Sequence, residues 1–263
     1  MTDAYQKLCA GLTALKLSAM RLSLDDTIDR VNSGELDFVS GLSLLVQRQV
    51  EETKRKRIET VVATAHFPSA KTFSGFDFGF QPELNKAEVM DLENLRFMED
   101  GSNVLFVGMP GVGKTHLAIA TGMAAARSGK TVYFLSAHEL LANLRKARME
   151  NRLEYRLRHY SSYSLLIIDE VGYLPVETED ANLLFELIAR RYENKSTIIT
   201  TNKALSRWGE MFGDAMVANA MLDRLLHHSK VFTIKGPSFR TRNYTVEEQK
   251  PPLTSADVKG SDK

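Results

Sequence analysis

The amino-acid sequence predicts an α/β protein in which a five-stranded parallel sheet lies between helices, preceded by a small all-helical domain. From Asn103 onward, short apolar runs typical of buried strands alternate with amphipathic stretches, the pattern of a parallel sheet covered on both faces. Before Phe67, leucines and methionines recur at helical spacing without β-branched runs. At 263 residues, the chain is long enough for one full α/β domain and a smaller module.

Four segments are expected along the chain. Residues 1–67 form the helical domain, and a helix continues through residues 46–62. Residues 68–82 are rich in Phe, Gly, Ser and Pro without a period, which predicts an extended connector lying against the next domain. Residues 83–245 form the α/β domain, and the polar stretch 246–263 predicts a disordered tail.

The elements of the α/β domain follow from apolar patterning. The expected strands are Asn103–Val107, Thr131–Ser136, Ser164–Asp169, Ser196–Thr201 and Val231–Ile234. The expected helices between them are Lys114–Arg127, Ala137–Arg158, Glu179–Tyr192 and Asp214–His227. Because parallel strands end at the same edge of a sheet, the residues after each strand are the first candidates for ligand binding.

Composition excludes several classes of protein. The chain is 43% hydrophobic and 25% charged, as ordinary globular proteins are, and it has no apolar run that could cross a bilayer or direct secretion. Cys9 is the only cysteine, so neither an internal disulfide nor a cysteine-rich zinc site is expected. We therefore expect a cytoplasmic protein without membrane partners. Because the net charge is only +1, contact with nucleic acid would need local basic patches.

A phosphate-binding loop follows the first expected strand. Its residues match G-x-x-x-x-G-K-[ST] and are Gly108, Met109, Pro110, Gly111, Val112, Gly113, Lys114 and Thr115. The glycines let backbone N–H groups approach the phosphates, and the following helix adds its positive end. Lys114 is expected to reach the β and γ phosphates of ATP, and Thr115 to offer its hydroxyl to Mg²⁺. The alternative, a glycine turn with a solvated lysine, is disfavoured because strand, loop and helix occur in the required order.

Two carboxylates end the third expected strand. Asp169 would hold Mg²⁺, and Glu170 would orient and deprotonate the water that attacks the γ phosphate. This second carboxylate favours hydrolysis of ATP over phosphorylation of a small substrate, because a transferring kinase does not use an activated water. The alternative is an acidic helix cap after a core strand.

Asn202 and Arg224 are weaker candidates. Asn202 follows the fourth strand and would reach the γ phosphate if that strand lies beside the first one, but an Asn after a strand is equally often a turn residue. Arg224 lies near the end of the last helix, where it could act on a neighbouring subunit's ATP as an arginine finger or simply pair with Asp223.

Basic residues recur at three- and four-residue spacing in the second helix of the α/β domain, at Arg145, Arg148, Arg152 and Arg156. This spacing predicts one helical face that could neutralise successive phosphates of a nucleic-acid backbone. A solvated face paired with nearby glutamates is the alternative. The same two readings apply to the run Lys54, Arg55, Lys56 and Arg57.

The pair His227–His228 does not predict a metal site. Adjacent side chains on a helix diverge, and no further ligand lies nearby in the sequence. Mg²⁺ at the phosphate-binding loop is therefore the one metal expected.

With these residues in view, the chain resembles the IstB-type helper ATPases of bacterial insertion sequences, members of the AAA+ group close to the helicase loader DnaC and the initiator DnaA. The resemblance runs from the expected connector to Arg242, and its most specific blocks are Asn103–Leu105, Gly111–Ala118, Ile168–Pro175, Asn182–Phe185, Arg190–Glu193, Thr201–Asn202 and Leu222–His228. It implies a P-loop NTPase fold of the AAA+ type, with too little chain after Arg242 for a large C-terminal lid domain.

The resemblance also implies an ATPase that forms a homo-oligomer on duplex DNA, with ATP at the subunit interfaces, and that controls a partner transposase. Arg224 then looks like the trans-acting finger, Asn202 like a sensor, and Arg240 like a second phosphate-sensing arginine, while His116 extends the nucleotide-binding loop. By the same resemblance, residues 1–67 would bind DNA or a partner, and the basic helix of the α/β domain would contact DNA. A DnaC-like helicase loader in DNA replication is the main alternative, and a metabolic P-loop kinase is a third.

Overall fold

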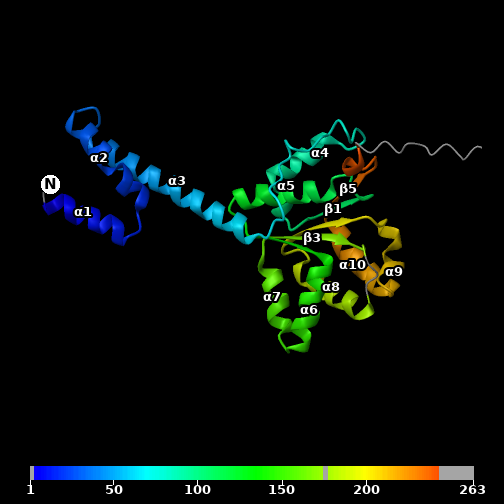
Figure 1. Cartoon of the computed structure of the whole chain (residues 1–263). Coiled ribbons are helices and arrows are strands. Elements are labelled where there is room, and N and C mark those ends of the chain that lie inside the picture. The colour runs from blue at the N-terminus through cyan, green and yellow to red at the C-terminus, as the bar shows by residue number, and fades with distance from the viewer. Residues whose placement is uncertain (1–2, 174–176, 243–263) are drawn as a thin grey trace, which may run out of the picture.

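The computed structural model describes residues 3–173 and 177–242, so the expected tail 246–263 lies outside the described residues. The described chain forms an α/β unit from which one long helix carries a small group of helices away (Figure 1). Within the described residues, no helix combines the length and the apolar character that a membrane span requires.

The α/β unit is built on five parallel strands in the order β2-β3-β4-β1-β5. The strands are β1 (Asn103–Gly108), β2 (Val132–Ser136), β3 (Leu165–Val171), β4 (Ser196–Thr201) and β5 (Ser229–Ile234). All five predicted strands are therefore confirmed. β1 lies between β4 and β5, so the phosphate-binding loop leaves the sheet near its centre.

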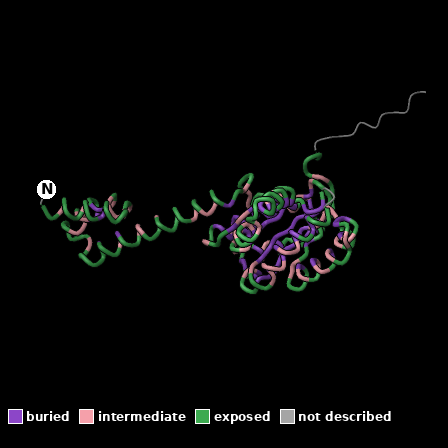
Figure 2. The backbone as a smooth tube through the Cα atoms, turned by 90° about the horizontal axis from the view of Figure 1, so that it is seen from below, coloured by how far each residue is buried: buried purple, intermediate pink, exposed green. Residues whose placement is uncertain are grey.

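Helices cover both faces of this sheet. They are α4 (Lys86–Asp91), α5 (Lys114–Arg127), α6 (Ala137–Met149), α7 (Leu153–Ser162), α8 (Thr178–Arg191), α9 (Trp208–Met211) and α10 (Ala215–His227), with short 3₁₀ turns at Leu92–Asn94, Arg96–Met98, Leu205–Arg207 and Phe239–Thr241. Side chains alternate along each strand: Val104 and Phe106 join the core under α4 and α5, whereas Leu105 joins the core under the helices from α6 to α10. Figure 2 shows these buried residues concentrated along the sheet.

The prediction of one continuous helix from Ala137 to Arg158 is wrong. Instead of one helix to Arg158, α6 ends near Glu150 and α7 begins at Leu153. Asn151 adopts φ +56°, and the N–H of Arg152 donates to the carbonyl of Ala147 at 2.7 Å, the hydrogen bond of a Schellman motif. Asn tolerates this left-handed conformation better than most residues, so it ends the helix without a glycine.

The N-terminal helices are α1 (Asp3–Ala14), α2 (Ser18–Asn32) and α3 (Phe38–Thr64). α3 is longer than predicted, and its amino end is capped by Asp37, whose carboxylate accepts from the Ser40 N–H at 2.9 Å. Leu12, Leu24 and Leu45 form a separate small core at the far end of α3. At its near end, the carbonyl of Ala65 accepts from the N–H of Phe134 at 2.8 Å, which attaches the helix to the edge strand β2.

Candidate active site

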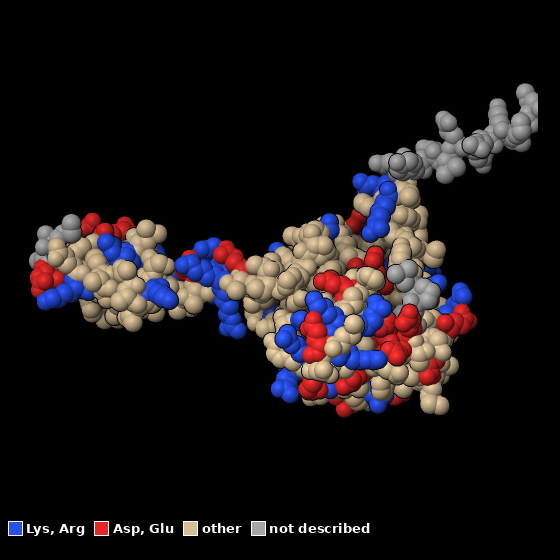
Figure 3. All heavy atoms as spheres, turned by 60° about the horizontal axis from the view of Figure 1, so that its bottom comes forward, with Lys and Arg blue, Asp and Glu red and all other residues tan. Residues whose placement is uncertain are grey.

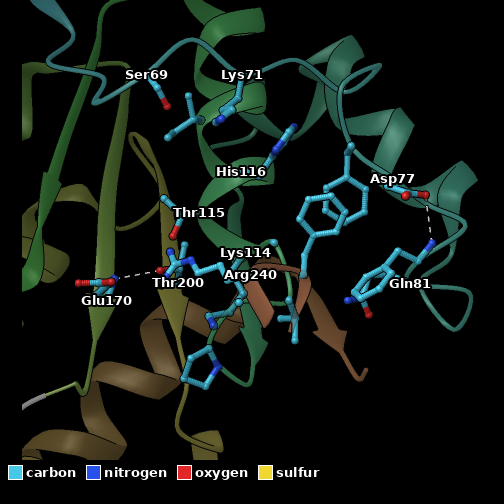
Figure 4. Close-up of a pocket in the computed structure, with 18 of the residues that line it drawn as sticks. Ser69, Lys71, Asp77, Gln81, Lys114, Thr115, His116, Glu170, Thr200 and Arg240 are labelled. Atoms are coloured by element: carbon cyan, nitrogen blue, oxygen red, sulfur yellow. Dashed lines mark hydrogen bonds between the residues drawn. The ribbon is translucent and has the colours of Figure 1, made fainter. Parts of the chain in front are cut away.

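A cavity of about 370 Å³ lies at the carboxyl edge of the sheet. This volume is within the range of small-molecule sites, which is about 300–1,000 Å³. The loop from Pro110 to His116 forms its floor, the ends of β3 and β4 contribute Glu170 and Asn202, and Arg240 closes one side. Figure 4 shows Lys114, Thr115, Thr200 and Arg240 close together, although they come from separate segments of the chain.

The phosphate-binding loop has the backbone conformation that its glycines allow. Gly111 and Gly113 adopt φ +83° and +103°, in the left-handed region that side chains disfavour. A Cβ atom at Gly113 would collide with the ring of Phe76, and one at Gly111 with Ser238. The loop is therefore packed between the connector and the segment after β5, and only glycine fits at both points.

Lys114 begins α5 at the base of the cavity. It is 8% exposed, and its Nζ donates to the carbonyl of Met109 at 2.8 Å. Burial lowers the pKa of Lys114, while the nearby Asp169 carboxylate opposes that shift. Met109 itself points its side chain into solvent, so Gly108 and Met109 support the loop, and the cavity lining begins at Pro110.

Asp169 is held by two hydroxyls. Its Oδ1 accepts from Thr115 Oγ1 at 2.9 Å and from Thr200 Oγ1 at 2.5 Å, and its side chain is buried at the end of β3. The hydroxyl and the carboxylate expected to hold Mg²⁺ are therefore in direct contact, and these hard oxygen ligands suit that ion.

Glu170 occupies an irregular point of β3. The pairing of β3 with β4 shifts register between Ile168 and Val171, and Glu170 adopts φ +61°. Its N–H donates to Thr200 Oγ1 at 2.9 Å, the bond drawn in Figure 4, and its side chain is exposed at the cavity. Bulges and strained residues of this kind re-aim side chains at functional sites. Here Glu170 is an exposed residue that lines the cavity.

Asn202 was expected to reach the γ phosphate if the fourth strand lies beside the first, and the structure has this arrangement. β4 lies directly beside β1, with Thr201 opposite Val107, so Asn202 follows next to the phosphate-binding loop and lines the cavity. Its Oδ1 is buried and has no hydrogen-bond partner within the described part of the chain. A buried polar atom left unpaired at a cavity is available to a ligand or to a water held by one.

The connector forms the opposite wall, which sequence reasoning did not predict. His116 Nε2 lies 2.9 Å from the carbonyl of Thr72, and the His116 ring contacts Phe76 edge to face. Gln81 Nε2 donates to the carbonyl of Pro237 at 3.1 Å, and its Oε1 is buried without a partner among the described residues. The only signal for this wall in the sequence was the aperiodic, aromatic composition of residues 68–82.

The two candidate arginines lie in different environments. Arg240 lines the cavity because Phe239 N–H donates to the carbonyl of Gly111 at 2.9 Å and holds the segment after β5 against the loop. Arg224 is on α10, away from the described residues that line the cavity. It donates to the carbonyl of Ala220 at 3.0 Å, and its guanidinium lies 4.8 Å from the ring centre of Phe185.

The four predicted arginines do not share one helical face, because the helix breaks between Arg148 in α6 and Arg152, which precedes α7. Arg145 lies 3.5 Å from Asp180, Arg148 is 2.7 Å from Glu179, and Arg152 is 3.9 Å from Glu150. Basic and acidic side chains are interspersed over the visible face of the α/β unit in Figure 3.

The run from Lys54 to Arg57 is divided between two environments on α3. Arg55 and Lys56 form ion pairs with Glu52, at 2.8 and 3.3 Å. The exposed residues Lys54 and Arg57 instead line a shallow groove between α2 and α3. These two carry positive charge at the surface of the long helix.

The expected divergence of His227 and His228 is wrong. His228 lies just beyond α10 with φ −125° and ψ 94°, so the two imidazole centres are 4.1 Å apart. Glu193, from the turn after α8, lies beside both rings. The divergence expected for adjacent side chains requires both residues to be inside a helix, and α10 ends at His227, before His228.

Comparison with known proteins gives a consistent picture. The family model described as IstB-like ATP binding protein matches residues 10–246. The insertion sequence IS232 putative ATP-binding protein of Bacillus thuringiensis subsp. berliner is 46% identical over 248 residues, 94% of this chain and 99% of that protein. The insertion sequence IS21 putative ATP-binding protein of Pseudomonas aeruginosa is 42% identical over 231 residues, 88% of this chain and 87% of that protein.

Solved structures share the fold of the α/β unit. The DnaC helicase loader is 28% identical, with a TM-score of 0.50 over 57% of this chain and 88% of that chain. AMPPCP-bound DnaA from Aquifex aeolicus is 24% identical, with a TM-score of 0.51 over 62% of this chain and 50% of that chain. The expected AAA+ P-loop fold is confirmed.

Proposed function

This chain belongs to the IstB-like family of ATP-binding proteins, and from that premise we propose that it hydrolyses ATP between its own subunits on duplex DNA and thereby controls a transposase. One observation carries the catalytic part. Lys114, Glu170 and Asn202 come from three separate segments and meet at one cavity, beside the buried carboxylate of Asp169.

The chemistry proposed is ATP plus water to ADP plus phosphate. Lys114 and the N–H groups of the loop would bind the β and γ phosphates. Thr115 and Asp169 would hold Mg²⁺, which neutralises negative charge on the phosphates when bound. The exposed carboxylate of Glu170 would accept the proton of the attacking water, and the unpaired Oδ1 of Asn202 would orient that water.

A further positive charge at the γ phosphate would come from Arg224 of a second subunit. Arg224 does not line the cavity of its own chain, and it lies half-buried on α10. Phe185 supports its guanidinium in a defined position. An arginine that reaches the γ phosphate of a neighbour would make subunit contact depend on ATP, because the contact is favourable only while that phosphate is present.

Mixing two inactive variants tests the shared site. Lys114→Ala removes a nucleotide-binding lysine and Arg224→Ala removes the finger, so each variant alone should lose ATPase activity. A mixture contains interfaces that combine the intact loop of one variant with the intact Arg224 of the other. Random mixing should restore about a quarter of wild-type sites. If Arg224→Ala alone keeps wild-type turnover and ATP-dependent assembly, the shared site is wrong.

The DNA and transposase parts rest on family context, because the relatives named above belong to insertion sequences. Sizing of the protein with and without duplex DNA, under ATP, ADP and no nucleotide, tests assembly. Glu170→Gln should trap the ATP-bound particle, since hydrolysis no longer resets it. Particles should form only with ATP and DNA together. A protein that stays monomeric and ignores duplex DNA would contradict the proposal.

A helicase loader is the second candidate, favoured by the 28% identity to the DnaC helicase loader. The two functions differ in what the N-terminal helices recognise. A loader would bind a replicative helicase through α1 to α3, whereas a transposition helper would bind duplex DNA with no helicase present. A pull-down of a purified replicative helicase, next to a duplex-binding assay, separates the two outcomes.

A further inference from the structure

A compact cluster of possible metal ligands lies at the edge of the sheet opposite the nucleotide cavity. His227 and His228 come immediately before β5, and Glu193 lies in the turn between α8 and β4. The nucleotide cavity is formed at the other, carboxyl ends of these parallel strands. The two sites therefore share no residue.

The distances within the cluster suit one small ion. His227 Nδ1 and His228 Nε2 lie 3.6 and 3.8 Å from the same oxygen of Glu193, and one ligand atom from each residue falls within 4.8 Å of the others. Two ligands of a tetrahedral zinc ion, each about 2.0–2.1 Å from the metal, are roughly 3.4 Å apart. The two separations from Glu193 are therefore only a few tenths of an ångström longer than in such a site.

The backbone that carries the three side chains is held in place. His227 is the last residue of α10, and the carbonyl of His228 accepts from the N–H of Asn103 at 2.8 Å, which ties His228 to the start of β1. Glu193 adopts φ +56° in the turn after α8. The three side chains are each about half exposed, so ions from solution can reach them.

We propose that Glu193, His227 and His228 form a binding site for a divalent transition metal of the Zn²⁺ class. Two imidazoles and one carboxylate are the ligands that zinc, nickel and copper ions accept, whereas Mg²⁺ prefers oxygen ligands alone. Three protein ligands leave a fourth position for water. The Tyr192 hydroxyl lies 2.6 Å from His227 Nδ1, and the metal displaces this hydrogen bond on binding.

The site joins two elements that the proposed function uses. His227 lies one turn beyond Arg224 on α10, and Glu193 follows α8, which carries Phe185 beneath the Arg224 guanidinium. A metal bound here cross-links the end of α10 to the turn after α8. Because it binds only the folded arrangement, it stabilises the folded protein. Metal binding itself does not depend on ATP hydrolysis, so the two proposals can fail separately.

Calorimetric titration of Zn²⁺ into the full, nucleotide-free chain tests the site, with millimolar Mg²⁺ present to occupy oxygen-ligand sites. The expected result is one Zn²⁺ per chain and a rise in thermal midpoint with Zn²⁺. Glu193→Gln, His227→Ala and His228→Ala should each weaken binding at least about tenfold, since even outer-shell changes cost about 10–100-fold. The thermal shift should disappear with the binding.

Three variants serve as matched controls. His138→Ala removes an exposed histidine outside the cluster, and Cys9→Ser removes the only thiol of the chain. Tyr192→Phe removes the hydroxyl that competes for His227 Nδ1 and leaves all three proposed metal ligands in place. All three should bind Zn²⁺ as the wild type does or more tightly. The proposal is overturned if the cluster variants titrate like the wild type, or if any control variant abolishes binding.

Discussion

The Thr200 hydroxyl connects the two carboxylate residues of the candidate active site. It donates to Asp169 at 2.5 Å and accepts from the N–H of Glu170 at 2.9 Å, where the backbone is held at φ +61°. One hydroxyl therefore orients a proposed Mg²⁺ ligand and the residue proposed to activate water. Thr200 is a positioning residue, because it does not itself need to touch the nucleotide.

Replacing Thr200 by Val keeps its shape and removes both hydrogen bonds. We expect kcat for ATP to fall about 10–100-fold, as when an outer-shell partner of a metal ligand is lost, with little change in nucleotide affinity. Thr200→Ser keeps the hydroxyl and should stay near the wild-type rate. Steady-state kinetics with both variants checks this. Equal losses in Val and Ser variants would point to packing rather than positioning.

Lys114 gives a pH-dependent prediction. Its pKa is lowered by burial, so in the free protein it loses its proton at a lower pH than an ordinary lysine does. The phosphates of ATP favour the charged form, so binding should take up a proton once the pH rises through this lowered pKa. Apparent affinity should fall over the same range.

Calorimetry of ATP binding in buffers with different ionisation enthalpies measures this uptake. Lys114→Arg is the control, because a guanidinium stays protonated and should show no uptake linked to this residue. Uptake of equal size in Lys114→Arg would contradict the assignment to Lys114.

At the scale of the elements, Arg191 joins the ends of α7, α8 and β4. It is 1% exposed and donates to the carbonyls of Tyr160 and Tyr163 at 2.9 Å each, to the Ser196 carbonyl at 2.5 Å, and to Thr197 Oγ1 at 3.0 Å. Burial lowers the pKa of Arg191 to about 9, so the side chain stays charged at neutral pH. The acceptors of these hydrogen bonds, three backbone carbonyls and one hydroxyl, carry no net charge.

Arg191→Met should lower the free energy of unfolding by about 2–4 kcal/mol, from several hydrogen bonds worth about 1 kcal/mol each. The adjacent Arg190 is a matched control, since it pairs at the surface with Glu154 and Glu186. Arg190→Met should change stability by less than about 1 kcal/mol. Denaturant unfolding of the two variants measures the difference, and similar losses would contradict the role given to burial.

At the scale of the whole molecule, α3 extends from the α/β unit with charged residues along its exposed surface (Figures 1 and 3). Lys54 and Arg57 are the members of its basic run that lie outside the ion pairs formed by Arg55 and Lys56 with Glu52. In the proposed DNA complex, charges that are not engaged by carboxylates are the ones available to phosphates.

The double variant Lys54→Gln, Arg57→Gln should lose about two phosphate contacts. The slope of log binding constant against log salt concentration should then become shallower by roughly 1.8. The matched double variant Arg55→Gln, Lys56→Gln removes the same charge from the same helix and should change the slope less. Binding measured over a series of salt concentrations tests this. An equal change in both variants would place the contact elsewhere.

Features that depend on local patterns of residues could be predicted from the sequence alone. Apolar runs such as Asn103–Val107 form strands wherever a sheet can bury them, and Gly111 and Gly113 allow a conformation that few other residues adopt. The fold class, the five strands, and the places of Lys114 and Glu170 at one cavity were predictable for this reason.

Contacts between segments far apart in the sequence became visible only in the folded chain. The left-handed turn at Asn151 divides the predicted basic helix, and the segment from Phe76 to Gln81 forms a wall of the cavity. His227 and His228 converge on Glu193 because α10 ends between them. Such contacts depend on packing between residues far apart in sequence, and no local periodicity encodes the free energy that selects them.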